Sequence, residues 1–258
     1  MAIDTPATIA IVGAGPLGLE AALYARYLGY DVVIFERGLV GQHVRELADA
    51  RMAAPFGSSR SALGLAALLA QDPTWQRPGE EDLLTAAEWL ERYLLRLASS
   101  DLLAPSIHQQ TEVIDVRGAD EVAEEPQQTT PGRSPGLMDA AETLAEDEEW
   151  VTYVPLVVSA RDASGVALHV VAEAVIVTSQ EFIKAKRLCG DEVSAQSPSP
   201  PDEVSSLATL VPNVYLLGGR TTAGGRSFED GLRQIRALFG LIGGRESLDL
   251  YPDLPRSA

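Results

Sequence analysis

The chain is poor in several features that would otherwise direct an interpretation of its function. Cys189 is its only cysteine, so an internal disulfide and a redox-active cysteine pair are both excluded. It contains no run of about 18 or more uncharged apolar residues, which predicts the absence of a transmembrane helix. The first residues, MAID, show neither the basic region nor the apolar core of a signal peptide. We therefore expect a cytoplasmic protein with no membrane partner.

Basic residues are scarce relative to acids. The 258 residues carry a formal net charge of −17, and Lys184 and Lys186 are the lysines. Nucleic acid is bound through a basic face, so this balance argues against nucleic acid as a partner. Hydrophobic residues make up 46% of the chain, enough for a substantial core. The length favours a single domain over residues 1–258.

Much of the negative charge is concentrated in one stretch. Between Gly118 and Trp150 the chain carries ten acids and one base, Arg133, with three prolines interspersed. Such a stretch buries little and repels itself, which predicts a mobile acidic insertion at 118–149. We interpret it as a solvated loop, with a docking site for a basic partner as the alternative. Residues 194–206, rich in Ser and Pro, are predicted to be a linker.

The N-terminal residues follow the order strand, glycine turn, helix, strand, acid. Residues 7–12 (ATIAIV) form an apolar run that ends at glycine, as a buried parallel strand does. Apolar residues keep helical spacing over 17–28, and Gly29 supplies the stop. Residues 31–35 (DVVIF) predict a second buried strand, which Glu36 follows. This order predicts a dinucleotide-binding βαβ unit.

Each glycine of the turn has a physical task in such a unit. Gly13 permits the tight turn out of the strand, and Gly15 lets the backbone approach a pyrophosphate at the helix N-terminus. Gly18 allows the helix to pack closely on the strands. Glu36 is placed to accept hydrogen bonds from an adenosine ribose, which suits FAD and NAD alike. The predicted cofactor-binding residues of this segment are Gly13, Gly15, Pro16, Leu17, Gly18, Glu36 and Arg37.

The remainder of the chain alternates helix and strand patterns. From Glu36 to about residue 80 the sequence reads as irregular. The turn signal at 162–165 (DASG) predicts a hairpin between two of the strands. The predicted helices are 82–97 and 228–242, and the predicted strands are 111–117, 151–161, 166–172, 174–178 and 214–217.

This order resembles the two-dinucleotide-binding flavoproteins, the superfamily of pyridine-nucleotide-disulfide reductases and flavin-containing monooxygenases. The run GAGPLG through FERG looks like the FAD site of that superfamily. HVRELADARMAAPFGSSRSALG looks like its segment that approaches the flavin, and WLERYLLRLA followed by TEVIDV looks like the helix and strand before its three-stranded meander. The resemblance implies an α/β, Rossmann-like FAD/NAD(P)-binding fold with a central parallel sheet, flanking helices and a β-meander.

The resemblance also implies further cofactor contacts. The backbone near Val113 would meet the adenine. EAVIVTSQ is similar to the strand ending in Ala-Thr-Gly, which places Ser179 beside the cofactor. VPNVYLLGG is similar to the Gly-Asp motif, which brings Gly218 and Gly219 to the flavin. The dipole of the last helix favours an anionic flavin, and the positive charge of Arg226 would add to this effect. The alternative is that Arg226 forms a local salt bridge.

The chain departs from this pattern in ways that bear on activity. Gln180 stands where the Ala-Thr-Gly glycine is expected, and Gly219 stands where the acid of the Gly-Asp pair is expected. Losing that acceptor costs cofactor binding on the order of 1–3 kcal/mol. There is no second GxGxxG, no nicotinamide domain and no Cys-x-x-Cys within these residues.

For the other candidate residues, both a functional role and a purely structural role are considered. His43 could stabilise a reduced flavin, but a partly buried hydrogen-bonding histidine is favoured. Cys189 is interpreted as an inert small residue, and no metal site is expected. The arginines of the irregular stretch could bind a pyrophosphate or an acidic substrate, but pairing with the acidic surface is favoured for each of them: Arg45, Arg51 and Arg60. Arg220 and Arg226 flank two glycines in the loop before the last helix.

Three functions remain open at this point. The first is an FAD-binding, monooxygenase-like oxidoreductase that acts on a small molecule and is reduced by its substrate or by a separate reductase. The second is a non-catalytic sensor or partner subunit that binds a dinucleotide. The third is a single-domain enzyme that uses NAD in place of FAD. The sequence assigns no catalytic residue, and a homo-oligomer is one further expectation.

Overall fold

The computed structural model describes residues 3, 5–119, 155–179, 182, 209, 211–218, 227–243, 249–252 and 254. The predicted acidic insertion, apart from residues 118 and 119, and the whole predicted linker lie outside the described residues. Within the described part of the chain, no helix has the length and apolar character needed to cross a membrane.

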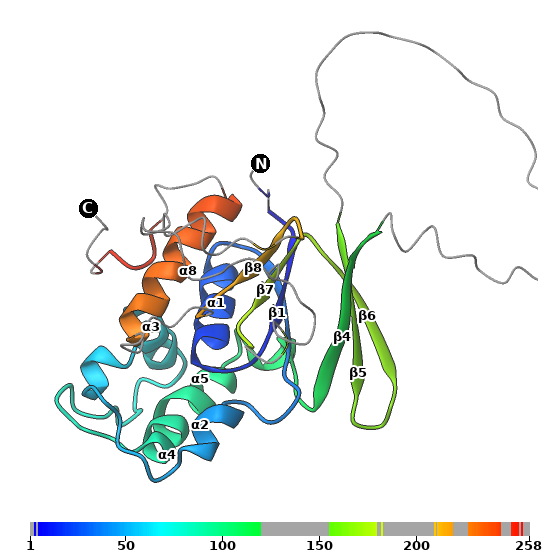
Figure 1. The fold of residues 1–258 in the computed structure, drawn as a ribbon. Helices are drawn as coiled ribbons and strands as arrows, with labels where there is room; N and C mark the ends of the chain where they lie inside the picture. Colours follow the sequence, from blue (N-terminus) through cyan, green and yellow to red (C-terminus); the bar gives the residue numbers. More distant parts are fainter. Residues whose placement is uncertain are drawn as a thin grey trace, which may run out of the picture.

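A parallel sheet of five strands forms the centre of the molecule (Figure 1). The strand order is β3-β2-β1-β7-β8. The sheet is covered on both faces, which explains why its strands read as apolar runs; all four residues of β7 are buried. The strands are β1 (Thr8–Val12), β2 (Asp31–Phe35), β3 (Ile107–His108), β7 (Ala174–Val177) and β8 (Val214–Leu216).

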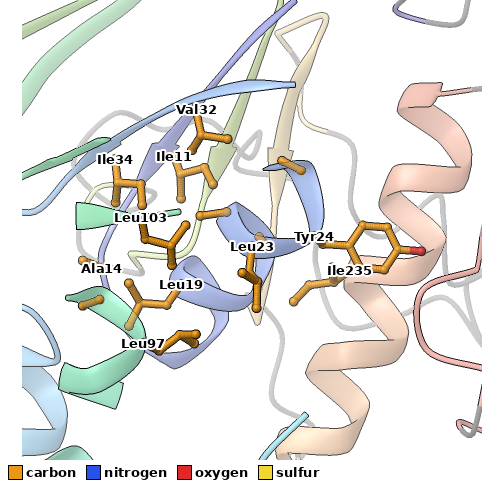
Figure 2. Packing of buried hydrophobic residues seen from close by; sticks show 14 of the residues in the cluster. Ile11, Ala14, Leu19, Leu23, Tyr24, Val32, Ile34, Leu97, Leu103 and Ile235 are labelled. Carbon is orange, nitrogen blue, oxygen red and sulfur yellow. The ribbon is translucent and has the colours of Figure 1, made fainter. Parts of the chain in front are cut away.

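Helices cover one face of this sheet. α1 (Pro16–Tyr27) lies directly on the strands, and α8 (Phe228–Gly243) and α3 (Ala62–Gln71) pack against α1. Figure 2 shows this interface, where Ile11 and Ile34 of the sheet meet Leu19 and Leu23 of α1. Tyr24 of the same helix stacks on Phe239 of α8 with ring centroids 5.0 Å apart. The helical face of the sheet therefore holds the larger core.

A three-stranded antiparallel meander covers the opposite face. It consists of β4 (Thr111–Gly118), β5 (Leu156–Asp162) and β6 (Ala167–Ala172). Its buried residues, such as Val158, pack on the alternate side chains of β1, Ala10 and Val12. The hairpin predicted at residues 162–165 is present: Asp162 Oδ1 accepts from the N–H groups of Ser164 and Val166, each at 2.9 Å. The predicted fold class is confirmed as a three-layer, Rossmann-like α/β fold with a β-meander.

The stretch expected to be irregular contains a ten-residue helix. α3 begins after Ser61, whose Oγ accepts from the N–H of Gly64 at 2.7 Å. The sequence ALGLAALLAQ that follows is apolar on most sides, so its helical period was obscured. Two shorter pieces, α2 (Gln42–Glu46) and a 3₁₀ turn at Phe56–Ser58, lie in the same stretch.

The helix predicted to start at residue 82 begins later. It comprises α4 (Ala86–Trp89), a π-type turn (Leu90–Leu94) and α5 (Leu95–Ala98). The residues before it are held in extended conformation, since the Leu84 carbonyl accepts from the N–H of Met52 and Thr85 bridges to Arg51. A second 3₁₀ turn, Ala104–Ser106, leads into β3. The start of this helix is therefore decided by a tertiary pairing.

Replacing Thr85 with alanine is expected to destabilise the protein by about 1 kcal/mol. Thr85 and Glu88 form a capping box, in which the Thr85 hydroxyl accepts from the N–H of Glu88 at 3.2 Å and Glu88 accepts from the N–H of Thr85 at 2.8 Å. Urea denaturation would measure the loss. Thr85→Ser retains the hydroxyl and is expected to stay close to wild type; equal losses in both variants would contradict the capping explanation.

Candidate dinucleotide site

The glycine turn after β1 is shaped by contacts that exclude side chains. Gly13 has a φ of +108°, and its N–H donates to the Phe35 carbonyl at 2.8 Å. A Cβ on Gly13 would lie 2.5 Å from Thr178 Oγ1, at the end of β7. A Cβ on Gly18 would lie 1.9 Å from the Gly13 carbonyl oxygen. The first turn of α1 is thus pressed against the strand ends.

Gly15 is different, because open space lies in front of it. A Cβ there would meet no heavy atom of the described chain within 4 Å. Gly15 is the N-cap of α1, no side chain caps the helix, and its first turn holds no acid. The N–H groups of Leu17 and Gly18 have no partner inside the helix, and the helix dipole adds positive potential there. This end of α1 can receive an anion such as a pyrophosphate.

Glu36 lies beside this turn and is fixed by two backbone donors. Its Oε2 accepts from the N–H of Ala14, and its Oε1 accepts from the N–H of Gly38, both at 2.8 Å. Each carboxylate oxygen has a second lone pair, so the group can still accept from a ribose hydroxyl. The bonds hold the carboxylate in place before any ligand binds.

A groove of about 420 Å³ begins next to Glu36. It lies between the loop after β2, the start of β4 and the β5–β6 hairpin. Gln110 N–H donates to the Gly38 carbonyl at 2.9 Å, which joins the first two of these segments. Residues on its walls include Arg37, Gly38, Gln42, Gln110, Glu112 and Arg161. The groove is lined by amide, carboxylate and guanidinium groups.

Val113 follows a residue that lines the groove, and Ser179 follows one that contacts the glycine turn. The Val113 side chain is only 5% exposed and belongs to the core under the meander, while its neighbour Glu112 faces the groove. Ser179 follows Thr178, whose hydroxyl donates to the carbonyl oxygens of Val12 and Gly13 at 3.1 and 3.3 Å. The strand end that carries Ser179 is thereby tied to the glycine turn.

Leu17 and Gly218 connect the glycine turn with the start of α8 through a packing contact and a hydrogen bond. Gly218 has a φ of +71°, and its N–H donates to the buried Gln234 Oε1 at 3.0 Å. The Leu17 side chain fills the space against two glycines, lying 3.2 Å from a Cβ on Gly218 and 2.2 Å from one on Gly231. Leu17 therefore contributes packing as well as its backbone. The remaining predicted positions, Gln180, Cys189, Gly219, Arg220 and Arg226, lie outside the described residues.

The other candidates of the sequence have local partners. His43 is a surface residue, since its side chain is 84% exposed and lies 3.6 Å from Glu46; the expectation of partial burial was wrong. Arg45 donates to the Val40 carbonyl at 3.1 Å, and Arg51 lies 3.5 Å from the Leu83 carbonyl. Arg60 pairs with Glu80 at 2.7 Å. The described residues contain no cluster of acids, histidines and cysteines suited to a metal.

Sequence reasoning missed the fully buried Glu20 of α1. Its carboxylate accepts from the Tyr93 hydroxyl at 2.8 Å and from the Tyr251 hydroxyl at 3.2 Å. Ser61 also bonds to it, and burial raises the pKa of this carboxyl in spite of the three hydroxyl groups. The only local signal is an acid inside an apolar helix. Its partners Tyr93 and Tyr251 are 73 and 231 positions away, so no sequence window contains the cluster.

The chain matches known proteins only at the level of solved structures. No family model matches the chain, and no curated protein matches it. Among solved structures, the bacillithiol disulfide reductase Bdr from Bacillus cereus is 14% identical with a TM-score of 0.41, over 68% of this chain and 40% of that one. An oxidized steroid monooxygenase bound to NADP is 19% identical with a TM-score of 0.42, over 67% and 26%. The flavin-dependent halogenase CmlS is 17% identical with a TM-score of 0.43, over 72% and 32%.

These neighbours are oxidoreductases at low identity, and the chain spans less than half the length of each. At such similarity they carry no argument about the cofactor or reaction of this chain. The interpretation of the site rests on its own geometry.

Proposed function

We propose that the chain binds FAD at the glycine turn and acts as a flavin-dependent oxidoreductase on a small molecule. One observation carries the proposal: the open, uncapped N-terminus of α1 at Gly15 stands beside the pre-positioned Glu36 carboxylate. An anion-binding helix end next to a ribose acceptor is the arrangement a dinucleotide requires.

Each part of the site would hold one part of FAD. The N–H groups of Leu17 and Gly18 would face the pyrophosphate, and Glu36 would accept from the ribose of the adenosine. The groove walls at Arg37, Gln110 and Arg161 would surround the nucleoside end. Bound FAD would supply the electron transfer, and the protein would supply orientation and electrostatics. We propose that the flavin is reduced by the substrate or by a separate reductase.

NAD is the alternative occupant, because Glu36 accepts from either adenosine ribose. A dinucleotide-binding sensor without catalysis is a further alternative, favoured by Gln180 and Gly219 at positions where the resembled family carries glycine and acid. The two alternatives differ from the main proposal in measurable ways. NAD leaves no flavin absorbance, and a sensor shows no turnover.

Protein purified from a flavin-rich host is expected to keep flavin absorbance through gel filtration. Glu36→Gln is expected to weaken dinucleotide binding about tenfold, since an amide has one acceptor oxygen for two backbone donors and a ribose. Titration of the apoprotein with FAD and with NAD would measure both effects. Asp31→Asn, at an exposed ion pair with Arg26, serves as a charge-matched control and should bind normally. A colourless protein that takes up NAD alone would overturn the FAD proposal.

A further inference from the structure

Residues 249–252 and 254, which we call the Tyr251 segment, contact α1 through an aromatic ring and a hydrogen bond. Tyr251 is only 2% exposed, and its ring meets that of Tyr24 edge-on with the centroids 5.0 Å apart. The N–H of Leu250 donates to the Tyr24 hydroxyl at 3.2 Å. The segment is therefore fastened to the middle of α1.

The same segment is fastened to α8 by one arginine. Arg236 donates to the Leu254 carbonyl at 3.0 Å and pairs with Asp249 at 3.6 Å. The described residues of the segment belong to no helix or strand. The segment is thus held against the two helices by contacts of single side chains, and local opening of such a segment costs less than unfolding of the core.

The Tyr251 hydroxyl ends on the one fully buried carboxyl among the described residues. It donates to Glu20 Oε2 at 3.2 Å, while the Tyr93 hydroxyl donates to Oε1 at 2.8 Å and Ser61 bonds to the same carboxyl. Within the described part of the chain, no arginine or lysine forms an ion pair with Glu20. The charged form of Glu20 is therefore buried without a cation, which is unfavourable.

The neutral form of Glu20 keeps its link to Tyr251. A protonated carboxyl has one O–H to donate. The Tyr93 hydroxyl already accepts from the N–H of Ser61 at 3.2 Å, whereas the Tyr251 hydroxyl accepts from no group of the described residues. Neutral Glu20 can therefore donate to Tyr251, and the closed arrangement needs no buried charge.

A cavity of about 260 Å³ adjoins this cluster at the start of α3. Its lining includes Ser61 and Tyr251, two of the three hydroxyl groups bonded to Glu20, and also Leu254. Departure of the Tyr251 segment would remove Tyr251 and Leu254 from the cavity wall. Water in the cavity would then reach the Glu20 carboxyl.

We propose that the Tyr251 segment is a pH-sensitive strap, which stays closed on α1 while Glu20 is neutral and opens when Glu20 ionises. Opening widens the cavity at the start of α3 and gives the carboxyl its water. The segment shares no residue with the glycine turn, so this device does not rest on cofactor binding.

The direction of the pH effect follows from the two environments of Glu20. Burial raises the pKa of this carboxyl in the closed form above its ordinary value of 4.5. In the open form water solvates the carboxylate, and its pKa returns toward the ordinary value. Between the two pKa values opening releases one proton to the solvent, so the equilibrium constant for opening rises about tenfold for each pH unit.

The other ionisable groups around Glu20 are neutral or paired. Burial raises the pKa of Tyr24, Tyr93 and Tyr251, so these hydroxyl groups stay neutral while the carboxyl titrates. The charged side chains on the neighbouring elements have ion-pair partners: Arg60 with Glu80, Arg233 with Glu229 and Arg236 with Asp249.

Hydrogen exchange of the full chain, measured from pH 4.5 upward, tests the strap. The readout is the protection factor of the Leu250 and Leu254 amides, which removes the intrinsic pH dependence of exchange. In wild type it should fall about tenfold per pH unit above 4.5 and then level off. In Glu20→Gln, which cannot ionise, it should not change with pH. Asp249→Asn is the matched control: it also turns a carboxyl into an amide, and it should lower protection but keep the pH dependence.

Two further readouts separate strap opening from other causes. The amides of β7 should be protected at least about 100-fold more than those of the Tyr251 segment, because opening is local. Tyr251→Phe keeps the ring on Tyr24 but removes the bond to Glu20, so it should lower protection of the segment about tenfold. Equal protection of the segment and β7, pH-independent protection in wild type, or a pH dependence that survives in Glu20→Gln would overturn the proposal.

Discussion

Gly18→Ala is expected to destabilise the protein by about 3 kcal/mol or more. The new methyl group would lie 1.9 Å from the Gly13 carbonyl oxygen and 3.1 Å from its carbon. These are backbone atoms, and the Gly13 N–H is bonded to the Phe35 carbonyl at 2.8 Å. The turn cannot yield without breaking the link between β1 and β2. Urea unfolding at a fixed pH would measure the loss.

Two other glycines provide controls for the same substitution. Gly240→Ala lies in α8 with open space around it, and alanine should stabilise that helix by about 0.5–1 kcal/mol. Gly15→Ala should leave stability nearly unchanged, because its φ is −80° and its Cβ would meet no heavy atom of the described chain within 4 Å. It should nevertheless weaken dinucleotide binding about tenfold or more, by occupying the space of the pyrophosphate. A Gly15→Ala variant that binds normally would contradict the proposed site.

Glu20→Ala is expected to cost about 3–5 kcal/mol, the second large effect. The substitution leaves a cavity between α1 and its neighbours and removes the acceptor of the Tyr93 and Tyr251 hydroxyl groups. Buried donors without a partner carry their full desolvation cost. Thermal unfolding would show a large drop in Tm. Glu20→Gln keeps a polar side chain of similar volume and should lose much less.

The pH dependence of stability separates the charge of Glu20 from its packing. Burial raises the pKa of Glu20 in the folded protein above the ordinary value of 4.5. Below pH 4.5 the carboxyl is protonated in both the folded and the unfolded protein, and the contribution of Glu20 to the free energy of unfolding is fully present. As the pH rises above 4.5, the unfolded carboxyl ionises first, so stability falls until the folded pKa is passed. The free energy of unfolding of wild type should therefore fall relative to that of Glu20→Gln as the pH rises from 4.5 to the folded pKa. If the difference in free energy between the two proteins does not change with pH, the raised pKa of Glu20 is contradicted.

The N-terminal unit was predictable because its signals are local. The apolar run of β1, the glycines of the turn and Glu36 lie within one continuous stretch, and each residue type is demanded by the backbone at its own position. The strands of the meander and the Asp162 turn follow from the same kind of local pattern. The start of α4 was not predictable, because the pairing of Thr85 with Arg51 keeps residues before it extended.

The amino-acid sequence alone determined the βαβ unit and its glycine turn, because the backbone conformation and close contacts at single positions allow only certain residue types there. The tertiary structure decided what surrounds that unit. It buried Glu20 among hydroxyl groups from three other segments, and it joined the loop after β2 to the meander to form a groove. Such contacts depend on the packing of elements that are far apart in the chain, and no local pattern encodes the distance between them.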